Sequence, residues 1–410
     1  MRRLLLFVLT LSLPLPLASA DWPRFRGVNG KGVADGPVPL DLADAKNLLW
    51  KVPIPGKGVS SPIVVGGKIY LQTASTDGKT RSMVCLDAAT GKPVWAKDVP
   101  GTTAHTHAKN SLASSTPACD GEMVYGVFWD GSVVGLRAFD LAGEQKWEAS
   151  FGGYVSQHGP GFSPVVHNGL VYVNVDDDKH AELLAFDTKT GDKKWTAARK
   201  SHRASYTPPF ILERPGKPAE LVLGTTTAIT AYEPATGKVV WNYPVVWEKG
   251  DMPLRVIGQP VYAAGLVVMA CGDGGGSRYA VAIDPKGGTP AKVWEHKKDI
   301  PYVPCMLVKD DLLFWITDKP GMACCADAKT GKLVWNERLF AKDVTSSPVM
   351  VGDKILMIAE NGDVVVVKAS KTFEEVHRAN LGEAVLASPA IADGKLYVRG
   401  ASHLFCFGKK

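Results

Sequence analysis

Short apolar stretches separated by glycine-containing turns run along most of the chain. Examples are SPIVVGGKIYLQT at 61–73, SPVVHNGLVYVNV at 163–175 and SPAIADGKLYVRG at 388–400. Each stretch predicts two strands joined by a hairpin, because strand-forming residues flank a glycine that lets the chain reverse. After residue 20, no stretch shows the 3.6-residue spacing of apolar side chains over ten or more positions that a helix requires. The pattern therefore predicts an all-β protein.

A second pattern follows these hairpins. LDAATGKPVW at 86–95 recurs as FDTKTGDKKW at 186–195, YEPATGKVVW at 232–241 and ADAKTGKLVW at 326–335, with looser copies at 139–147 and 283–294. The acidic residue accepts backbone N–H bonds and the glycine supplies a positive φ, so the motif predicts a turn into a fourth strand that carries the tryptophan. Four antiparallel strands per unit are typical of a propeller blade.

The spacing of the tryptophans gives the number of blades. The interval between successive copies is 41 to 53 residues, which is the period of a propeller repeat. One further interval of 41 residues reaches Val376, in a degenerate copy, and that makes eight units; seven remain if this copy is not a true unit. The tryptophans that mark the others are Trp50, Trp95, Trp147, Trp195, Trp241, Trp294 and Trp335.

Both ends of the repeated region hold an incomplete blade. The last unit, at 387–407, has three strands and no tryptophan strand, while the segment at 48–52 is a tryptophan strand without partners. Pairing the two would close the ring and remove both exposed edges. We therefore expect residues 47–408 to form an eight-bladed propeller of four-stranded antiparallel blades, closed by the N-terminal strand.

The N-terminus indicates export. Arg2 and Arg3 precede an apolar run and then Ala-Ser-Ala at 18–20, which is the pattern of a cleavable signal peptide at 1–20. Residues 21–46 read as an irregular, glycine-rich leader, which we expect to lie along the surface of the propeller. We expect a periplasmic or secreted monomer.

Other features limit the partners of the exported chain. Asp21, not a cysteine, follows the cleavage site, which argues against a lipid anchor, and no later segment has 18 consecutive apolar residues to span a membrane. Removing Arg2 and Arg3 lowers the net charge from +6 to +4, which is too diffuse to favour nucleic acid.

Of the seven cysteines, three lie in third strands (Cys85, Cys325, Cys406) and two in first strands (Cys119, Cys305), and this scatter favours small buried residues between blades. Cys324 and Cys325 are adjacent. Neighbours on a strand point to opposite faces, so a bond between them needs a distorted peptide, and we expect two unpaired thiols rather than a vicinal disulfide.

The repeated D-x-x-T-G-x-x-x-W motif and its preceding strand resemble the PQQ-type β-propeller repeat over residues 48–408. That repeat occurs in quinoprotein alcohol dehydrogenases and in BamB, a non-catalytic propeller of outer-membrane assembly. The leader WPRFRGVNGKG at 22–32 is similar to the start of many exported PQQ-binding-like propeller proteins. The resemblance implies that the repeated tryptophans join blades and do not stack a quinone. It says little about function, because one fold hosts many sites.

The topology of a blade places the candidate site. Loops that enter the first strand and loops between the second and third strands share one face, which we call the loop face; the hairpins and D-x-x-T-G turns occupy the other, the hairpin face. Long loops on a rigid scaffold usually carry function. The binding candidates on the loop face are His105, His107, His158, Arg203 and Arg255. Two arginines at the channel mouth would suit an anionic ligand, unless each pairs with a local acid.

Two groups have the residue types of a metal site. His105 and His107 point to the same side of an extended segment, and Asp176, Asp177 and Asp178 offer oxygen ligands for Ca²⁺. The first lacks further ligands and the second lacks the alternating spacing of calcium loops, so a solvated loop and a polar hairpin tip are favoured over metal sites. No zinc-peptidase or α/β-hydrolase motif is present, and we assign no catalytic residue.

Two functions remain. The first is an exported, non-catalytic binding or scaffold protein that binds an envelope protein or a small anionic ligand by its loop face. The alternative is a quinoprotein oxidoreductase with PQQ in the funnel and calcium at the quinone. The quinoprotein dehydrogenases that the repeat resembles are longer, and this chain lacks a haem-attaching C-x-x-C-H. These absences favour the binding protein; PQQ and calcium stay open as cofactors, and neither is assigned.

Overall fold

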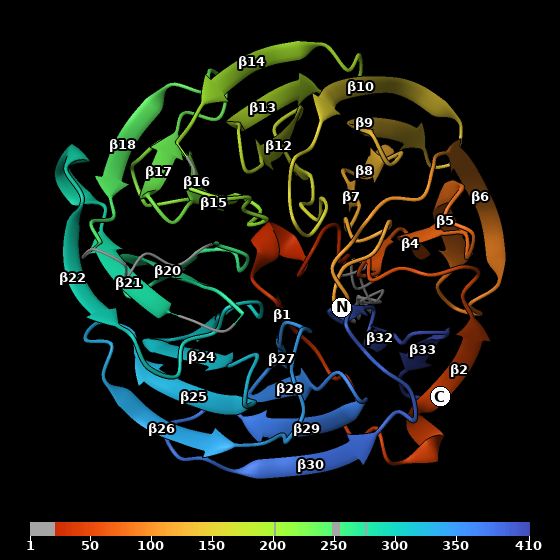
Figure 1. The fold of residues 1–410 in the computed structure, drawn as a ribbon. Helices are drawn as coiled ribbons and strands as arrows, with labels where there is room; N and C mark the ends of the chain where they lie inside the picture. Colours follow the sequence, from red (N-terminus) through yellow and green to blue (C-terminus); the bar gives the residue numbers. More distant parts are fainter. Residues whose placement is uncertain (1–20, 201, 248–254, 275–276) are drawn as a thin grey trace, which may run out of the picture.

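The computed structural model describes residues 21–200, 202–247, 255–274 and 277–410, so the predicted signal peptide lies outside the described residues. Eight antiparallel sheets surround a central axis, as Figure 1 shows. The predicted fold class and the number of eight blades are confirmed, and β30 (Glu375–Asn380), which contains Val376, is a true outer strand.

Each blade runs from a short inner strand to a long outer one. Blade 1 holds β3 (Ile63–Val65), β4 (Lys68–Ala74), β5 (Thr80–Asp87) and β6 (Pro93–Pro100); blade 2 holds β7 (Ala118–Cys119), β8 (Met123–Trp129), β9 (Val133–Asp140) and β10 (Gln145–Gly153). Blade 3 holds β11 (Val165–His167), β12 (Leu170–Asp176), β13 (Ala181–Asp187) and β14 (Lys193–Ala198); blade 4 holds β15 (Phe210–Leu212), β16 (Glu220–Gly224), β17 (Ala228–Tyr232) and β18 (Val239–Pro244).

The second half of the ring repeats this order. Blade 5 holds β19 (Val261–Ala263), β20 (Leu266–Gly272), β21 (Arg278–Asp284) and β22 (Ala291–His296); blade 6 holds β23 (Leu307–Lys309), β24 (Leu312–Ile316), β25 (Met322–Asp327) and β26 (Leu333–Arg338). Blade 7 holds β27 (Val349–Val351), β28 (Lys354–Ile358), β29 (Asp363–Lys368) and β30. Blade 8 holds β31 (Ala390–Ala392), β32 (Lys395–Arg399), β33 (His403–Phe407) and β2 (Leu48–Pro53). The described helices are 3₁₀ turns: η1 (Val28–Gly30), η2 (Ala45–Asn47) and η3 (Lys286–Gly288).

Blade 8 is built from both ends of the chain, as predicted. The N-terminal strand β2 pairs antiparallel with β33, and Trp50 lies opposite Cys406. In Figure 1 the red β2 lies as the outermost strand beside the blue β33. This pairing gives the third strand of the last blade its partner and leaves no gap in the ring.

The apolar core lies between blades. Along β24, Leu313 and Trp315 pack with residues of blade 5, whereas Phe314 and Ile316 pack with residues of blade 7. The middle strands are therefore apolar on both faces, and burying a side chain of this size contributes about 1.5–3 kcal/mol. Cys324 and Cys325 follow the same alternation, one thiol in each cluster, and both are free.

The repeated tryptophan packs on the turn of the next blade. Trp195 lies so close to Gly237 that a Cβ on this glycine would be 2.5 Å from the ring, and its indole N–H donates to the Pro234 carbonyl at 3.1 Å. The same donation to the next turn recurs at Trp95, Trp147, Trp294 and Trp335. Trp241 differs: its N–H donates to the Glu220 carboxylate, and η3 stands where the next turn would be. Tryptophan and glycine thus recur together because they form one contact.

A belt of hydrogen bonds follows the channel wall from blade 5 through blade 8 to blade 3, where the inner strands begin. The Ser388 N–H donates to the Ser61 hydroxyl at 2.9 Å, which connects blade 8 to blade 1, and the Ser61 N–H donates to Thr116 at 3.1 Å. The belt continues through the backbone N–H groups of Thr116, Gln259, Cys305 and Ser347. Each of these groups donates to a serine or cysteine side chain of the next blade. It fixes the segments that enter the blades.

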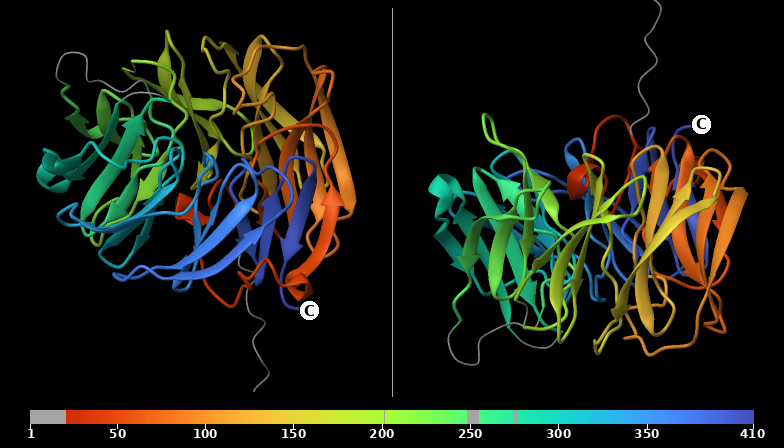
Figure 2. Two further views of the ribbon diagram at one scale, coloured as in Figure 1. Left: turned by 60° about the horizontal axis from the view of Figure 1, so that its bottom comes forward. Right: turned by 90° about the horizontal axis from the view of Figure 1, so that it is seen from above.

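The leader was expected along the surface, and this prediction is wrong for its first half. Arg24 and Arg26 are buried, and β1 (Val33–Ala34) pairs in parallel with the inner strand β27. Along the way the leader bonds to the inner strands or their starts in blades 1, 2, 4, 5, 6 and 7. Figures 1 and 2 show this red segment within the ring. The correction has a physical reason: the side chains and backbone of this segment satisfy inner-strand groups that would otherwise face an open channel.

We expect Gly237→Ala to destabilise the protein by about 2–4 kcal/mol, because a positive φ costs an L-residue 1–2 kcal/mol and overlap with Trp195 adds a similar amount. Gly169→Ala is the matched control: its φ is +75° against +72° at Gly237, but a Cβ there meets no atom within 4 Å. Urea unfolding of both variants measures the difference. Equal losses would show that the ring contact contributes nothing.

Deleting residues 21–54 removes β2 and should give a product that aggregates as its concentration rises, because the edge of β33 is then unpaired. Light scattering of the purified product measures this. Deletion of residues 21–46, which keeps β2, is the control. If both products aggregate alike, the β33 edge is not the cause.

Candidate functional site in the loop-face funnel

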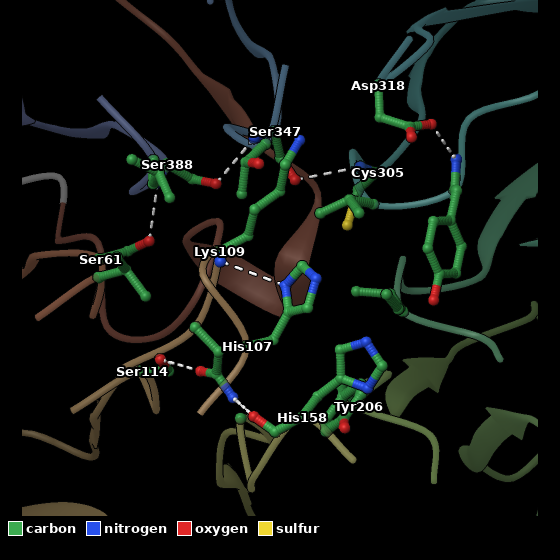
Figure 3. Close-up of a pocket in the computed structure, with 18 of the residues that line it drawn as sticks. Ser61, His107, Lys109, Ser114, His158, Tyr206, Cys305, Asp318, Ser347 and Ser388 are labelled. Carbon is green, nitrogen blue, oxygen red and sulfur yellow. Dashed lines mark hydrogen bonds between the residues drawn. The ribbon is translucent and has the colours of Figure 1, made fainter. Parts of the chain in front are cut away.

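The loop face opens into a funnel on the axis, with a cavity volume of about 450 Å³. Its wall receives residues from the entering segments of all eight blades. Phe25 of the leader also lines it, so the leader forms a floor at the hairpin-face end. Figure 3 shows these side chains converging. The topology therefore gathers eight separate loops on one blind cavity.

Arg255 is a buried charge in the funnel wall. It precedes β19, its backbone is bridged to Gly272, and only 2% of the residue is exposed. Its Nε and Nη2 have no hydrogen-bond partner among the described residues. The guanidinium group lies near Tyr302, whose pKa rises through burial despite this positive neighbour. A buried cation without a carboxylate partner is costly, and such a group points to a ligand.

Two histidines lie beside this cation. The rings of His107 and His158 are 4.7 Å apart between centroids, and both residues line the funnel. Burial, the charge of Arg255 and the nearby His107 lower the pKa of His158 to about 4. His158 is therefore neutral near pH 7, and its buried Nδ1 has no partner in the described part of the chain. A neutral imidazole can donate or accept a hydrogen bond without repelling an anion.

A strap crosses the funnel from blade 2 to blade 7. Lys109, in the loop before β7, places its Nζ 2.7 Å from Asp343 and 2.7 Å from Glu360. Asn110 fixes the base of the strap by donating to the His158 carbonyl at 2.7 Å. The hydrogen bond from Lys109 lowers the pKa of Asp343. The pKa of Lys109 is raised, since these two carboxylates outweigh the opposing effect of burial.

The predicted binding residues do not all meet. His107, His158 and Arg255 line the funnel, but His105 is exposed outside its lining. Arg203 also lies outside the lining and bonds to Asp178 at 3.0 Å. The alternative that each arginine pairs with a local acid is therefore correct for Arg203 and not for Arg255.

The three consecutive aspartates serve separate internal contacts. Asp176 is fully buried, 2.7 Å from Arg199, and burial raises its pKa to about 6 despite that cation. Asp177 accepts the N–H groups of its own turn and of Val155. Asp178 accepts a hydrogen bond from Arg203. Burial alone would raise the pKa of Asp178, but this bond and other contacts lower it. Within the described residues, no group of three or more His, Cys, Asp or Glu side chains is placed to hold a metal ion.

Comparison with known proteins decides the family. The family model described as outer membrane protein assembly factor BamB matches residues 40–151, 138–337 and 321–407, which is most of the chain. The chain belongs to the BamB propeller family. The BamB of Burkholderia pseudomallei is 26% identical over 379 residues, covering 88% of each chain. The BamB of Shewanella oneidensis is 22% identical over 248 residues, covering 54% of this chain and 58% of the relative.

Solved structures share the fold of this BamB-family chain. BamB from Moraxella catarrhalis superposes with a TM-score of 0.64 at 14% identity, covering 88% of this chain and 99% of that structure. Quinohemoprotein alcohol dehydrogenase from Comamonas testosteroni gives a TM-score of 0.63 at 15% identity, covering 95% of this chain and 81% of that structure. At these identities the likeness shows the fold alone.

Sequence reasoning missed several residues of the funnel in this BamB-family chain. Lys109 lies in the same loop as His105 and His107, at 104–110. Only the two histidines were predicted as binding residues. No sequence pattern indicated Asp343 or Phe25, because the residues that they contact are far away in the chain.

Among the described residues, no helix has the length and apolar character to cross a membrane.

The strap should make stability depend on pH through Asp343. A carboxyl group whose pKa falls on folding stabilises the protein above its unfolded value, about 3.9, and loses this contribution as the pH falls through the folded value. Asp343→Asn should therefore lower the thermal midpoint at pH 7, and its difference from the wild type should vanish toward pH 3. Thermal unfolding between pH 3 and pH 7 tests this. Asp35→Asn, at an exposed leader position, is the control; a constant difference for Asp343→Asn would refute the role of the strap.

Proposed function

We propose that this chain is an exported, non-catalytic binding protein that takes an anionic group of a partner into the loop-face funnel. One observation carries the proposal: Arg255 is buried in the funnel wall with two guanidinium nitrogens unpartnered in the described structure. A carboxylate can accept from both nitrogens at once, in the bidentate geometry that arginine favours.

The surroundings of Arg255 support an anion over a cation. His158 stays neutral near pH 7. Both carboxylates that line the funnel are engaged by cations, Asp318 by Arg278 at 3.0 Å and Asp343 by Lys109 at 2.7 Å. Lys319 also lines the funnel but is exposed to solvent, whereas the charge at Arg255 is buried and has no carboxylate partner among the described residues.

The family supports an envelope protein as the source of the anionic group. The relatives of this chain are named outer membrane protein assembly factors, and the predicted signal peptide would deliver this chain to the periplasm or beyond. An acidic segment of such a protein is the partner that fits the funnel. In this proposal the ring is a rigid scaffold, and specificity lies in the entering loops.

The alternative is a PQQ- and calcium-dependent oxidoreductase, favoured by the likeness in fold to quinohemoprotein alcohol dehydrogenase. PQQ carries carboxylates, so Arg255 could hold one of them. Calcium fits less well, because it needs several oxygen ligands and the two carboxylates of the funnel are ion-paired. The residues present do not fit the complete cofactor site, and we derive no reaction step through it.

Fluorescence anisotropy with a labelled oligo-glutamate peptide tests the proposal. We expect Arg255→Gln to weaken binding at least tenfold, since losing a buried charge partner costs about 2–5 kcal/mol. Arg203→Gln should weaken it less than threefold, because Arg203 is outside the funnel lining and pairs with Asp178. Arg255→Gln should also keep or raise the thermal midpoint, as it removes an unpaired buried cation.

The outcomes separate the two functions. An oligo-lysine peptide that binds as well as oligo-glutamate, or equal effects of the two arginine substitutions, would contradict the proposal. Incubation with PQQ and calcium is a second arm. Alcohol-dependent dye reduction in that arm would establish the oxidoreductase instead.

A further inference from the structure

Two buried guanidinium groups lie beneath the funnel floor, on either side of Phe25. Arg24 is 5% exposed and Arg26 is 1% exposed. Arg24 donates to the Pro209 carbonyl and the Gln259 side chain, and Arg26 donates to the carbonyls of Lys31 and Met306. No carboxylate of the described chain bonds to either group. Two adjacent cations in a buried place call for a negative charge.

The thiol of Cys305 is the group that can supply this charge. Cys305 lies beside both arginines, because Arg24 donates to the side chain of Gln259 and Arg26 donates to the carbonyl of Met306, the residue that follows Cys305. It accepts the Gln259 N–H at 3.3 Å as its part of the belt. The Nε and Nη1 atoms of Arg26 have no partner within the described residues, so the cations are not satisfied by neutral contacts alone.

Cys305 borders the funnel, although only 2% of the residue is exposed. It lines the cavity, and Figure 3 shows its sulfur projecting from the wall. Arg255, with two unpartnered nitrogens, lines the same cavity. The two enter on neighbouring segments, because a Cβ on Gly258 would be 3.8 Å from the Cys305 sulfur. An anion drawn into the funnel therefore passes one cation and meets a thiol beside two others.

The other six cysteines lack these features. Burial raises the pKa of every one of them. They do not line the funnel. Cys119 is the closest comparison, since its N–H bonds to Pro23 of the leader and it borders a separate groove on the hairpin face. A thiol reacts as the thiolate, so such buried thiols are inert while one beside cations is reactive.

We propose that Cys305 is a modification site, where the protein forms a mixed disulfide with a small anionic disulfide that enters the funnel. The Cys305 thiol loses its proton to water, and its sulfur attacks one sulfur of the incoming disulfide. One S–S bond forms and one breaks, and the departing thiolate takes up a proton. The guanidinium groups of Arg24 and Arg26 stabilise the thiolate, and their charge selects anionic disulfides over cationic ones. This inference does not require the proposed function, because it depends on the leader arginines and not on Arg255.

The test incubates the chain with glutathione disulfide, which is anionic, or with cystamine, which is cationic, and maps adducts by mass spectrometry. We expect one adduct, on Cys305, formed at least tenfold faster with glutathione disulfide at low salt. The preference should shrink at high salt, which screens the guanidinium charges. An adduct that appears first on another cysteine, or a rate with cystamine that equals or exceeds the other, would overturn the proposal.

Variants locate the effect. Cys305→Ser should abolish the adduct, while the matched Cys119→Ser should leave its rate unchanged. Arg26→Gln should slow the reaction at least threefold and Arg26→Lys should restore part of it. If Arg26→Gln does not fold, the comparison of the two disulfides on the wild type decides. An unchanged adduct in Cys305→Ser would refute the assignment.

Discussion

A blade of this protein has two apolar faces, and it can bury them only between two other blades. Leu313 and Phe314 are neighbours in one strand, yet they belong to the cores on opposite sides of blade 6. Ring closure is therefore the condition on which every core depends. The pairing of β2 with β33 meets it with the two ends of one chain. The tryptophan contact and the belt then fix how each blade is set against the next.

Because the ring is closed, the packing between blades stabilises the fold without the residues that line the funnel. The belt holds the start of the inner strand in every blade except blade 4, so the entering loops project from a rigid rim. Arg255 can then be held in the funnel wall as a buried cation, because the packing of the ring offsets the cost. The leader adds the floor, and it converts an axial channel into a cavity with one opening. A channel open at both ends would hold a ligand less well than this blind funnel.

Much of this was predictable, because the repeat is a local pattern. Trp195 and Gly237 recur at fixed spacing, and the orphan strand at 48–52 indicated where the ring closes. The site was predictable only in outline. The topology places the loops on one face, but whether Arg203 or Arg255 meets an acid depends on the three-dimensional position of Asp178. The leader was misjudged because its arginines bond mainly to backbone carbonyls and one amide, which leave no complementary charge in the sequence.

The antiparallel pairing of β2 with β33 has a mechanical consequence. Leu48, at the start of β2, lies opposite Phe407, at the end of β33, so both chain ends leave the seam on the same side. A force on the two ends would peel these strands apart one hydrogen bond at a time, instead of shearing all bonds together. The leader stands between that force and the seam, because Trp22 and β1 are bonded to blades 1 and 7. The segment that closes the channel would thus bear the load first.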